Sequence, residues 1–222
     1  MSIQRCYLVG GAPLSGKSTQ AVELLSRYPD ALYLPTDDVY EWMVSSGRAD
    51  AYPALAAATG IEPEQFYTEH TNPQEIVDHE IRRGHAISQE LVGLLRHAQL
   101  LGGVVVVEGY PITPGAAKDL QQRFAEVNFT VTFLYESDAE RISRRIASRG
   151  LYSRPPESYP DWIKPREAEW VRLYNEYYRS EASRYGFAVM TNANSTERSP
   201  ADLLALPEQK HREWRQRLGL NL

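Results

Sequence analysis

The sequence predicts an α/β fold, a three-layer sandwich in which helices cover both faces of a five-stranded parallel sheet. Short apolar runs typical of buried strands recur along the chain and alternate with stretches whose apolar residues have helical spacing. A glycine-rich loop joins the first such run to the first helix. This alternation is the pattern of a parallel sheet with helical crossovers. The predicted strands are residues 6–9, 31–34, 104–107, 129–135 and 187–190.

The loop after the first predicted strand fits the pattern G-x-x-x-x-G-K-[ST] at every fixed position. An apolar run of strand type precedes it, and a helical pattern follows at residues 20–25, so the strand, loop and helix stand in the order that a phosphate-binding loop requires. The candidate nucleotide-binding residues are Gly11, Ala12, Pro13, Leu14, Ser15, Gly16, Lys17, Ser18 and Thr19.

Each fixed residue of this loop has a physical task. Gly11 and Gly16 let the backbone turn so that successive N–H groups point at one anion, and the helix that follows directs its positive dipole end to the same place. We expect Lys17, as an exposed loop residue, to reach the β- and γ-phosphates of ATP, and the hydroxyl of Ser18 to hold Mg²⁺.

Carboxylates follow two of the predicted strands. Asp37 and Asp38 come after the second strand, and Glu108 comes after the third, within Glu-Gly-Tyr-Pro at residues 108–111. Ligands of open α/β sheets bind at the carboxyl ends of the strands, so these acids are expected beside the phosphate loop. One aspartate is expected there and the other as the N-cap of the next helix. Substrate contacts are expected from Asp38, Glu108 and Tyr110, and a metal contact from Glu108 together with Ser18.

Residues 39–103 read as a helical insertion on the substrate side, with short helices and loops up to residue 73. A long helix follows at 74–101, in which Gly84 allows a bend, and two glycines end it. We expect the main domain to span residues 1–196 and a C-terminal helical extension to span 197–222.

An arginine-rich helix follows the fourth predicted strand, capped by Ser137 or Asp138. Four prolines between residues 151 and 165 exclude regular structure there and indicate a lid at about 150–165. The helix after it, at about 166–184, carries an aromatic face that is expected to be core.

Composition excludes several classes of protein. Among 222 residues the net charge is −5 and the pI is about 5.6, which disfavours a general nucleic-acid-coating protein. Cys6 is the only cysteine, so neither a disulfide framework nor a cysteine-based metal site is expected. No apolar run approaches the roughly 18 residues of a membrane span, and nothing resembles a signal peptide, so we expect a cytoplasmic protein without a membrane partner.

With these motifs the sequence resembles the P-loop kinases of small molecules and nucleic-acid ends, among them polynucleotide 5′-hydroxyl kinases, chloramphenicol phosphotransferases, zeta-type toxins and adenylate kinases. The resemblance covers about residues 5–192. In polynucleotide kinases the first aspartate of a paired motif takes the proton of the substrate hydroxyl, which implies that role for Asp37. Lid arginines of these families match Arg145 and Arg149. The adenylate kinase Asp-Gly-Phe-Pro stretch is similar to residues 108–111, but the arginine that follows it there is Ile112 here.

Together these features predict an ATP-dependent kinase that transfers the γ-phosphoryl group to a hydroxyl of a small molecule, with Lys17, Asp37, Arg145 and Arg149 as catalytic residues. A nucleotide or polynucleotide kinase is an alternative, for which the insertion offers only Arg48, Arg82 and Arg83 as a basic groove. A P-loop NTP hydrolase or switch acting through a protein partner is another. The sequence leaves open the acceptor, the choice between ATP and GTP, which aspartate is the base, and the oligomeric state.

Overall fold

The computed structural model describes residues 3–56, 61–149, 151, 160–191 and the single positions 213 and 216, without the side chain of Arg149. Its elements in chain order are β1 (Ile3–Gly11), α1 (Lys17–Arg27), β2 (Leu32–Pro35), α2 (Thr36–Ser45), the 3₁₀ helix η1 (Arg48–Ala51), α3 (Pro53–Ala56), α4 (Pro63–Glu69), α5 (Pro73–Leu101), β3 (Gly103–Glu108), α6 (Pro114–Arg123), β4 (Asn128–Tyr135), α7 (Ala139–Arg149), α8 (Ile163–Arg184) and β5 (Ala188–Thr191).

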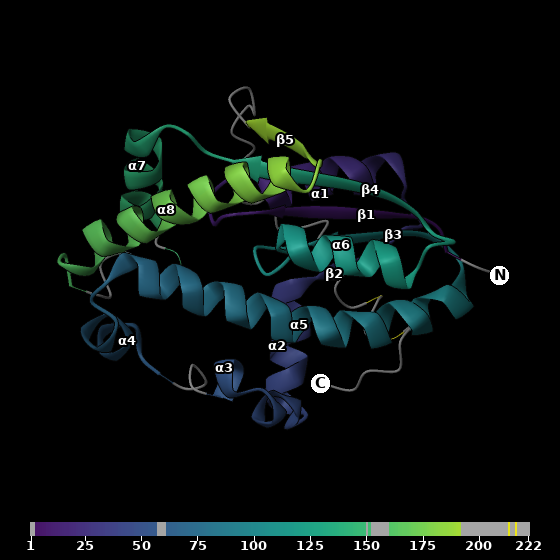
Figure 1. Cartoon of the computed structure of the whole chain (residues 1–222), viewed down its shortest axis with the longest axis horizontal. Helices are drawn as coiled ribbons and strands as arrows, with labels where there is room; N and C mark the ends of the chain where they lie inside the picture. Colours follow the sequence, from purple (N-terminus) through teal and green to yellow (C-terminus); the bar gives the residue numbers. More distant parts are fainter. Residues whose placement is uncertain are drawn as a thin grey trace.

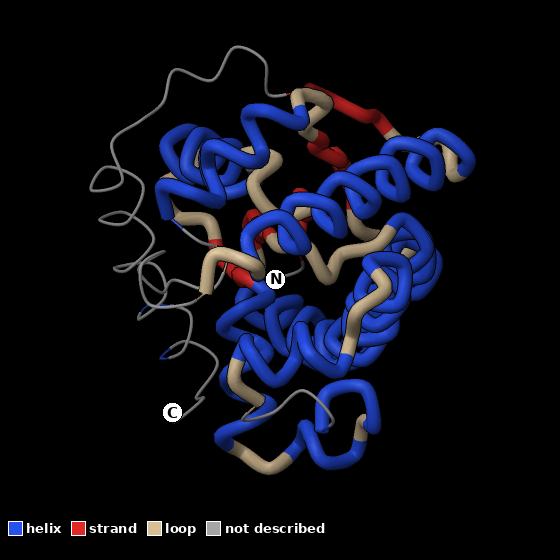
Figure 2. Tube along the Cα trace, turned by 90° about the vertical axis from the view of Figure 1, so that its left-hand side faces the viewer, coloured by secondary structure: helices blue, strands red, loops and turns tan. Residues whose placement is uncertain are grey.

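The five strands form one sheet in the order β2-β3-β1-β4-β5, and every neighbouring pair is parallel. Helices lie on both sides of this sheet (Figure 1), and Figure 2 shows the strands enclosed between them. The predicted fold class is therefore confirmed. Each predicted strand is present. The observed strand ends differ from the predicted ones by up to three residues, because pairing with neighbouring strands determines where a strand ends.

Alternate residues of the central strands enter two separate cores, as the two-residue period of a strand requires. On one face Tyr33 and Val106 pack with Leu25 of α1. On the other face Val105 and Val107 pack in the larger core, together with residues of α5, α6 and α8. Because helices cover both faces of the sheet, a ligand can approach it only at an edge. The loops that follow the carboxyl ends of the strands lie at such an edge.

Helix α5 runs without interruption through Gly84, where a bend was allowed (Figure 1). A Cβ atom at this glycine would lie 2.6 Å from the backbone oxygen of Pro111, so the residue serves close packing against the loop after β3. The aromatic side chains of Trp170, Tyr174 and Tyr178 on α8 are buried, which confirms that this face belongs to the core.

Two predicted segments lie largely outside the described residues. Of the lid at 150–165, residues 150 and 152–159 are not described, and its last three residues belong to α8. Of the extension at 197–222, only positions 213 and 216 are described, and both are helical. No helix in the described ranges combines the length and the apolar character needed to cross a membrane.

Candidate active site

The phosphate-binding loop connects β1 to α1 and has the backbone that its glycines were expected to allow. Gly11 and Gly16 have φ angles of 137° and 96°, and Leu14, with φ of 66°, is the one non-glycine residue of the described chain in the left-handed region. Ser15 is fully buried, and its hydroxyl has no hydrogen-bond partner among the described residues. Since buried polar atoms are normally paired, this unpaired hydroxyl fits a loop whose shape suits an anion.

Lys17 is the first residue of α1, and its side chain folds back over the loop. Its Nζ donates a hydrogen bond of 2.8 Å to the backbone oxygen of Ala12. The expectation of an exposed loop residue is wrong, because Lys17 is only 8% exposed. The ammonium group is therefore held inside the concave side of the loop, where phosphate oxygens would compete with the Ala12 carbonyl for it.

Glu108, the last residue of β3, faces this loop. Its Oε1 accepts a bond of 3.4 Å from the hydroxyl of Ser18, and its Oε2 accepts one of 3.0 Å from the hydroxyl of Tyr33. Burial raises the pKa of the Glu108 carboxyl above its ordinary value, and Asp37 adds to this, although Lys17 and the two hydroxyl donors oppose it. The structure thus brings together the two residues predicted to contact a metal.

Oxygen ligands of this kind suit Mg²⁺, which in kinases takes few protein ligands and several phosphate or water oxygens. Ser18 and Glu108 fit that requirement, since their oxygen atoms converge at the mouth of the loop. No cluster of three or more histidine, cysteine, aspartate or glutamate side chains able to hold a metal by itself exists among the described residues.

Asp37 and Asp38 both lie in the first turn of α2, which starts at Thr36, directly after β2. The expectation that one of them is the N-cap is wrong, because Pro35 holds that position and no side chain caps the helix. The helix begins at Thr36, three residues before Val39, its first buried apolar residue. Apolar spacing alone therefore places the start of the helix too late. Asp37 is exposed and Asp38 is buried, so only Asp37 offers its carboxylate to solvent.

The environment of Asp37 suits a proton acceptor. Although its side chain reaches solvent, the surrounding protein reduces its hydration, and this raises the pKa of the carboxyl above its ordinary value. The charges of Lys17 and Arg83 act in the opposite direction, while Asp38 and Glu80 act in the same direction as burial. A carboxylate whose pKa is raised is a better base than an ordinary aspartate.

Arg83 and Glu80 on α5 also belong to this part of the site. Sequence reasoning named Arg83 only as a cation of a possible basic groove, and it missed Glu80 and the pairing of the two. Nη1 of Arg83 contacts both carboxylate oxygens of Glu80 at 3.0 and 3.2 Å, and the guanidinium lies 4.7 Å from the ring centre of Tyr40 and 5.9 Å from that of Tyr110. Burial would raise the pKa of Glu80, but Arg83 and His79 outweigh it and the pKa is lowered. Two charges three residues apart on a helix look like a solvent-exposed pair, and no sequence signal distinguishes this one.

Tyr110 takes part in the site in two ways. Its ring faces Arg83, and its backbone oxygen accepts hydrogen bonds from the hydroxyls of Tyr174 and Tyr178 on α8. Ile112, which stands where the adenylate kinase stretch has an arginine, is buried in the core. The loop after β3 therefore contributes the ring of Tyr110, and no lysine or arginine of its own, to the space beside Asp37.

Arg145 of α7 reaches the phosphate-binding loop from the other side. Its Nη1 donates a hydrogen bond of 2.5 Å to the backbone oxygen of Leu14. Arg149 is the last residue of α7, but its side chain lies outside the described part of the structure. Of the two predicted lid arginines, the structure thus places one at the loop. The site as described unites a phosphate cradle, two cations that contact it, and acids on the opposite wall.

The chain was compared with known proteins, and no family model matches it. Curated relatives include proteins named 2-phosphoglycerate kinase from Methanocaldococcus jannaschii, 26% identical over 191 residues, and from Methanococcus maripaludis, 26% identical over 196 residues. The match covers 86% of this chain but only 59% and 60% of the two relatives, so the chain spans about three fifths of their length. The resemblance to P-loop kinases of small molecules is borne out by these relatives.

Two solved structures are similar over most of their length. TT1252 from Thermus thermophilus has a TM-score of 0.47 and 17% identity, covering 96% of this chain and 98% of that one. Shikimate kinase from Acinetobacter baumannii has a TM-score of 0.41 and 15% identity, covering 99% and 96%. Scores this low carry no argument about the site, which depends on the geometry described above.

Proposed function

We propose that this protein is an ATP-dependent kinase that transfers the γ-phosphoryl group to a hydroxyl of a small molecule. One observation carries the proposal: Asp37, an exposed carboxylate in the first turn of α2, has a raised pKa and interacts electrostatically with Lys17 of the loop that would hold the phosphates. Phosphoryl transfer requires mainly positioning and charge stabilisation, together with a group that accepts the proton of the nucleophile. The relatives' names are consistent with this chemistry.

Each side chain then has a role. The backbone N–H groups of the loop and Lys17 bind the phosphates, and Asp37 orients the acceptor hydroxyl and takes its proton. Ser18 and Glu108 would hold Mg²⁺, which when bound would neutralise charge on the β- and γ-phosphate oxygens. Arg145, and Arg149 by its resemblance, would stabilise the charge that develops on the transferred group. Asp38 and Tyr110 would line the acceptor side together with Arg83 of α5.

The first acceptor to test is 2-phosphoglycerate, because the curated relatives are named for it. Since the chain spans only about three fifths of their length, its acceptor is tested within a panel. The panel contains 2-phosphoglycerate, glycerate, shikimate, a nucleoside monophosphate and a 5′-hydroxyl oligonucleotide, each with Mg²⁺ and ATP labelled in the γ-phosphate. The expected result is label transferred to a small molecule, at a rate that Asp37→Asn lowers by about 10² or more.

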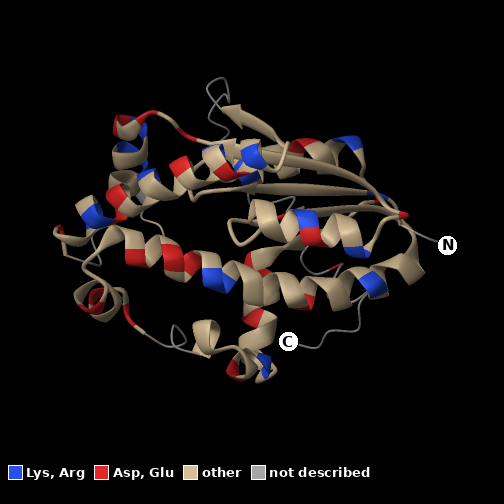
Figure 3. Ribbon diagram, viewed as in Figure 1, with Lys and Arg blue, Asp and Glu red and all other residues tan. Residues whose placement is uncertain are grey.

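Charge on the acceptor side favours a small molecule over a nucleic acid. Of the three arginines considered for a basic groove, two are paired with acids, since Arg48 lies 3.4 Å from Glu90 and Arg83 lies 3.0 Å from Glu80. In Figure 3 the basic residues of the described chain are dispersed among acidic ones, without a continuous basic band along α5. A backbone of phosphates binds through several unpaired cations, which this wall does not present.

The same experiment separates the kinase from a hydrolase or switch. A hydrolase would release phosphate from ATP at the same rate with and without any acceptor, and Asp37→Asn would leave that rate unchanged. Phosphate release of this kind, with no labelled product from any compound of the panel, would contradict the proposal.

A further inference from the structure

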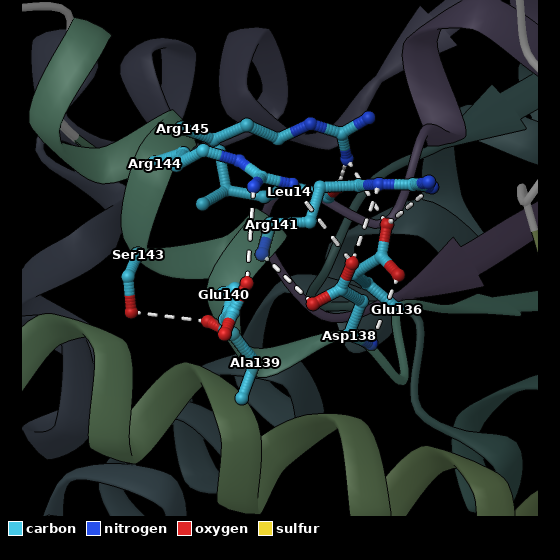
Figure 4. A network of polar contacts seen from close by, with 9 residues as sticks. All are labelled: Leu14, Glu136, Asp138, Ala139, Glu140, Arg141, Ser143, Arg144 and Arg145. Carbon is cyan, nitrogen blue, oxygen red and sulfur yellow. Dashed lines mark hydrogen bonds and ion pairs between the residues drawn. The ribbon is translucent and has the colours of Figure 1, made fainter.

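Glu136 lies at the carboxyl end of β4 and is only 7% exposed. Its Oε2 contacts two arginines of α7, at 3.2 Å from Nη1 of Arg141 and 3.5 Å from Nη1 of Arg145. Its Oε1 accepts a bond of 3.1 Å from the backbone N–H of Asp138. Figure 4 shows both arginines directed at this one carboxylate. One buried carboxylate thus contacts two arginines that the sequence pattern alone would place on the surface of a helix.

The main chain of Glu136 is fixed as firmly as its side chain. Its backbone N–H donates a bond of 2.7 Å to the side-chain oxygen of Asn175 on α8, and the amide nitrogen of Asn175 in turn donates to the backbone oxygen of Val171. The carboxylate therefore has a defined position relative to the sheet and to α8, and it can define the position of whatever it holds.

Arg145 connects this carboxylate to the phosphate-binding loop. The same nitrogen, Nη1, that faces Glu136 also donates to the Leu14 carbonyl, and Leu14 is the loop residue with φ of 66°. Both contacts of Arg145 within the described chain run through Nη1, and its side chain is 22% exposed. Within the described part of the chain, no residue contacts the rest of its planar fork of N–H donors, which could bind phosphate oxygens held by the loop.

We propose that Glu136 is a positioning residue for phosphoryl transfer, which holds the guanidinium of Arg145 at the loop before nucleotide arrives. This inference depends on the proposed function and assigns a residue to it. An arginine side chain has many rotamers, and a guanidinium that is ordered beforehand stabilises the transition state without the entropic cost of ordering it. Arg141 contacts the same oxygen of Glu136, Oε2, at 3.2 Å, and so helps to fix the carboxylate that holds Arg145.

Helix α7 contains a matched control. Glu140 also neighbours an arginine, Arg144, at 3.9 Å, but its side chain is 89% exposed and makes no contact with the loop. Replacing either glutamate with glutamine removes one negative charge, at positions only four residues apart in the chain. Only the replacement of Glu136 releases Arg145. A difference in affinity between the two variants therefore reports on the position of the Arg145 guanidinium and not on net charge.

The test measures the affinity for ADP with Mg²⁺, in the presence and absence of aluminium fluoride, which imitates the transferring phosphoryl group and requires no acceptor. Fluorescent ADP is titrated with the wild type, Glu136→Gln, Glu140→Gln, Arg145→Ala and the double variant Glu136→Gln/Arg145→Ala. We expect Glu136→Gln to lose about tenfold of the affinity gained with aluminium fluoride, with ADP affinity alone nearly unchanged. Glu140→Gln should equal the wild type, and the double variant should equal Arg145→Ala.

Three results would overturn the inference: Glu136→Gln behaves like Glu140→Gln, Glu136→Gln further weakens the Arg145→Ala variant, or the wild type gains no affinity from aluminium fluoride. If Glu136→Gln does not fold, as thermal unfolding would reveal, Glu136→Asp gives the same test, because it keeps the charge and withdraws it from Arg145. Failure of the proposed function is distinguishable, since it would appear as absent transfer to every acceptor while the aluminium fluoride series still ranks the variants.

Discussion

Replacing Glu108 with glutamine removes a buried charge while keeping the shape of the side chain. Glu108 is 8% exposed, and burial raises the pKa of its carboxyl in the folded protein. A carboxyl with a raised native pKa contributes stability only while it is protonated, and this contribution is lost as the pH rises through the native pKa. At neutral pH the ionised Glu108 therefore destabilises the fold, and Glu108→Gln should be more stable than the wild type.

The size of this stabilisation depends on the buried charge that is removed and on the hydrogen bonds that glutamine can keep. Each unit of pKa difference between the folded and unfolded states corresponds to about 1.4 kcal/mol. Glutamine keeps an oxygen that can accept the hydroxyl bond from Tyr33, so little is lost with the charge. We expect a gain of about 1 kcal/mol in the free energy of unfolding at pH 7, or about 3 °C in Tm for a chain of this size.

The assay is urea unfolding of the wild type and the variant between pH 3.5 and 8. The difference in unfolding free energy should be near zero at the acid end, where both side chains are neutral, and should grow to a plateau as Glu108 ionises. In the same variant we expect the Mg²⁺ dependence of ATP binding to shift by about tenfold toward higher metal concentration, because a charged oxygen ligand is lost. The exposed residue Glu140 supplies the control substitution.

A pH-independent difference, or a variant that is less stable than the wild type at pH 7, would refute the argument about burial. An unchanged Mg²⁺ dependence would refute the assignment of Glu108 as a metal contact while leaving the argument about burial intact. The two parts of the prediction therefore fail separately.

Three further substitutions test other parts of the site. Lys17→Ala should abolish nucleotide turnover and leave a folded protein, and a folded variant with near-wild-type turnover would contradict the role of the loop. Asp37→Asn should lower kcat by about 10² to 10⁴ while ATP affinity stays within about threefold, and in the wild type the acid limb of kcat/KM should lie above the ordinary range of aspartate, because its pKa is raised. Gly109→Ala should destabilise the protein by about 2 to 4 kcal/mol in urea unfolding, since a Cβ there would lie 1.6 Å from the hydroxyl oxygen of Thr36, whereas Gly93→Ala, which meets nothing within 4 Å, should be neutral or stabilising.

Features carried by short stretches of chain could be predicted from the sequence. The phosphate-binding loop needs its two glycines and its lysine at fixed spacing, and the valine run of β3 needs two buried faces, so each pattern determines its own local structure. Asp37 and Glu108 could be placed in one site because parallel strands bring their carboxyl ends to one edge.

Features that depend on contacts between distant segments could not be predicted. Arg83 is 46 positions from Asp37 in the sequence and acts on it only because α5 packs beside α2. Glu136 looks like an ordinary polar residue after a strand until α7 places two arginines on it. The burial of Lys17 depends on the path of the loop in three dimensions, which the motif leaves unspecified.

The path of the chain between β2 and β3 has a consequence for how such a protein can diversify. The chain leaves the sheet after Pro35 and returns at Gly103 as the neighbouring parallel strand, so helices α2 to α5 form one uninterrupted stretch. The loop after β1 and helix α7, which contact each other through Leu14 and Arg145, lie outside that stretch. Exchange of this one internal stretch could therefore change Asp37, Asp38 and the helices of the acceptor side without changing the strand order, while Glu108 and Tyr110 stay with the sheet and the phosphate-binding loop.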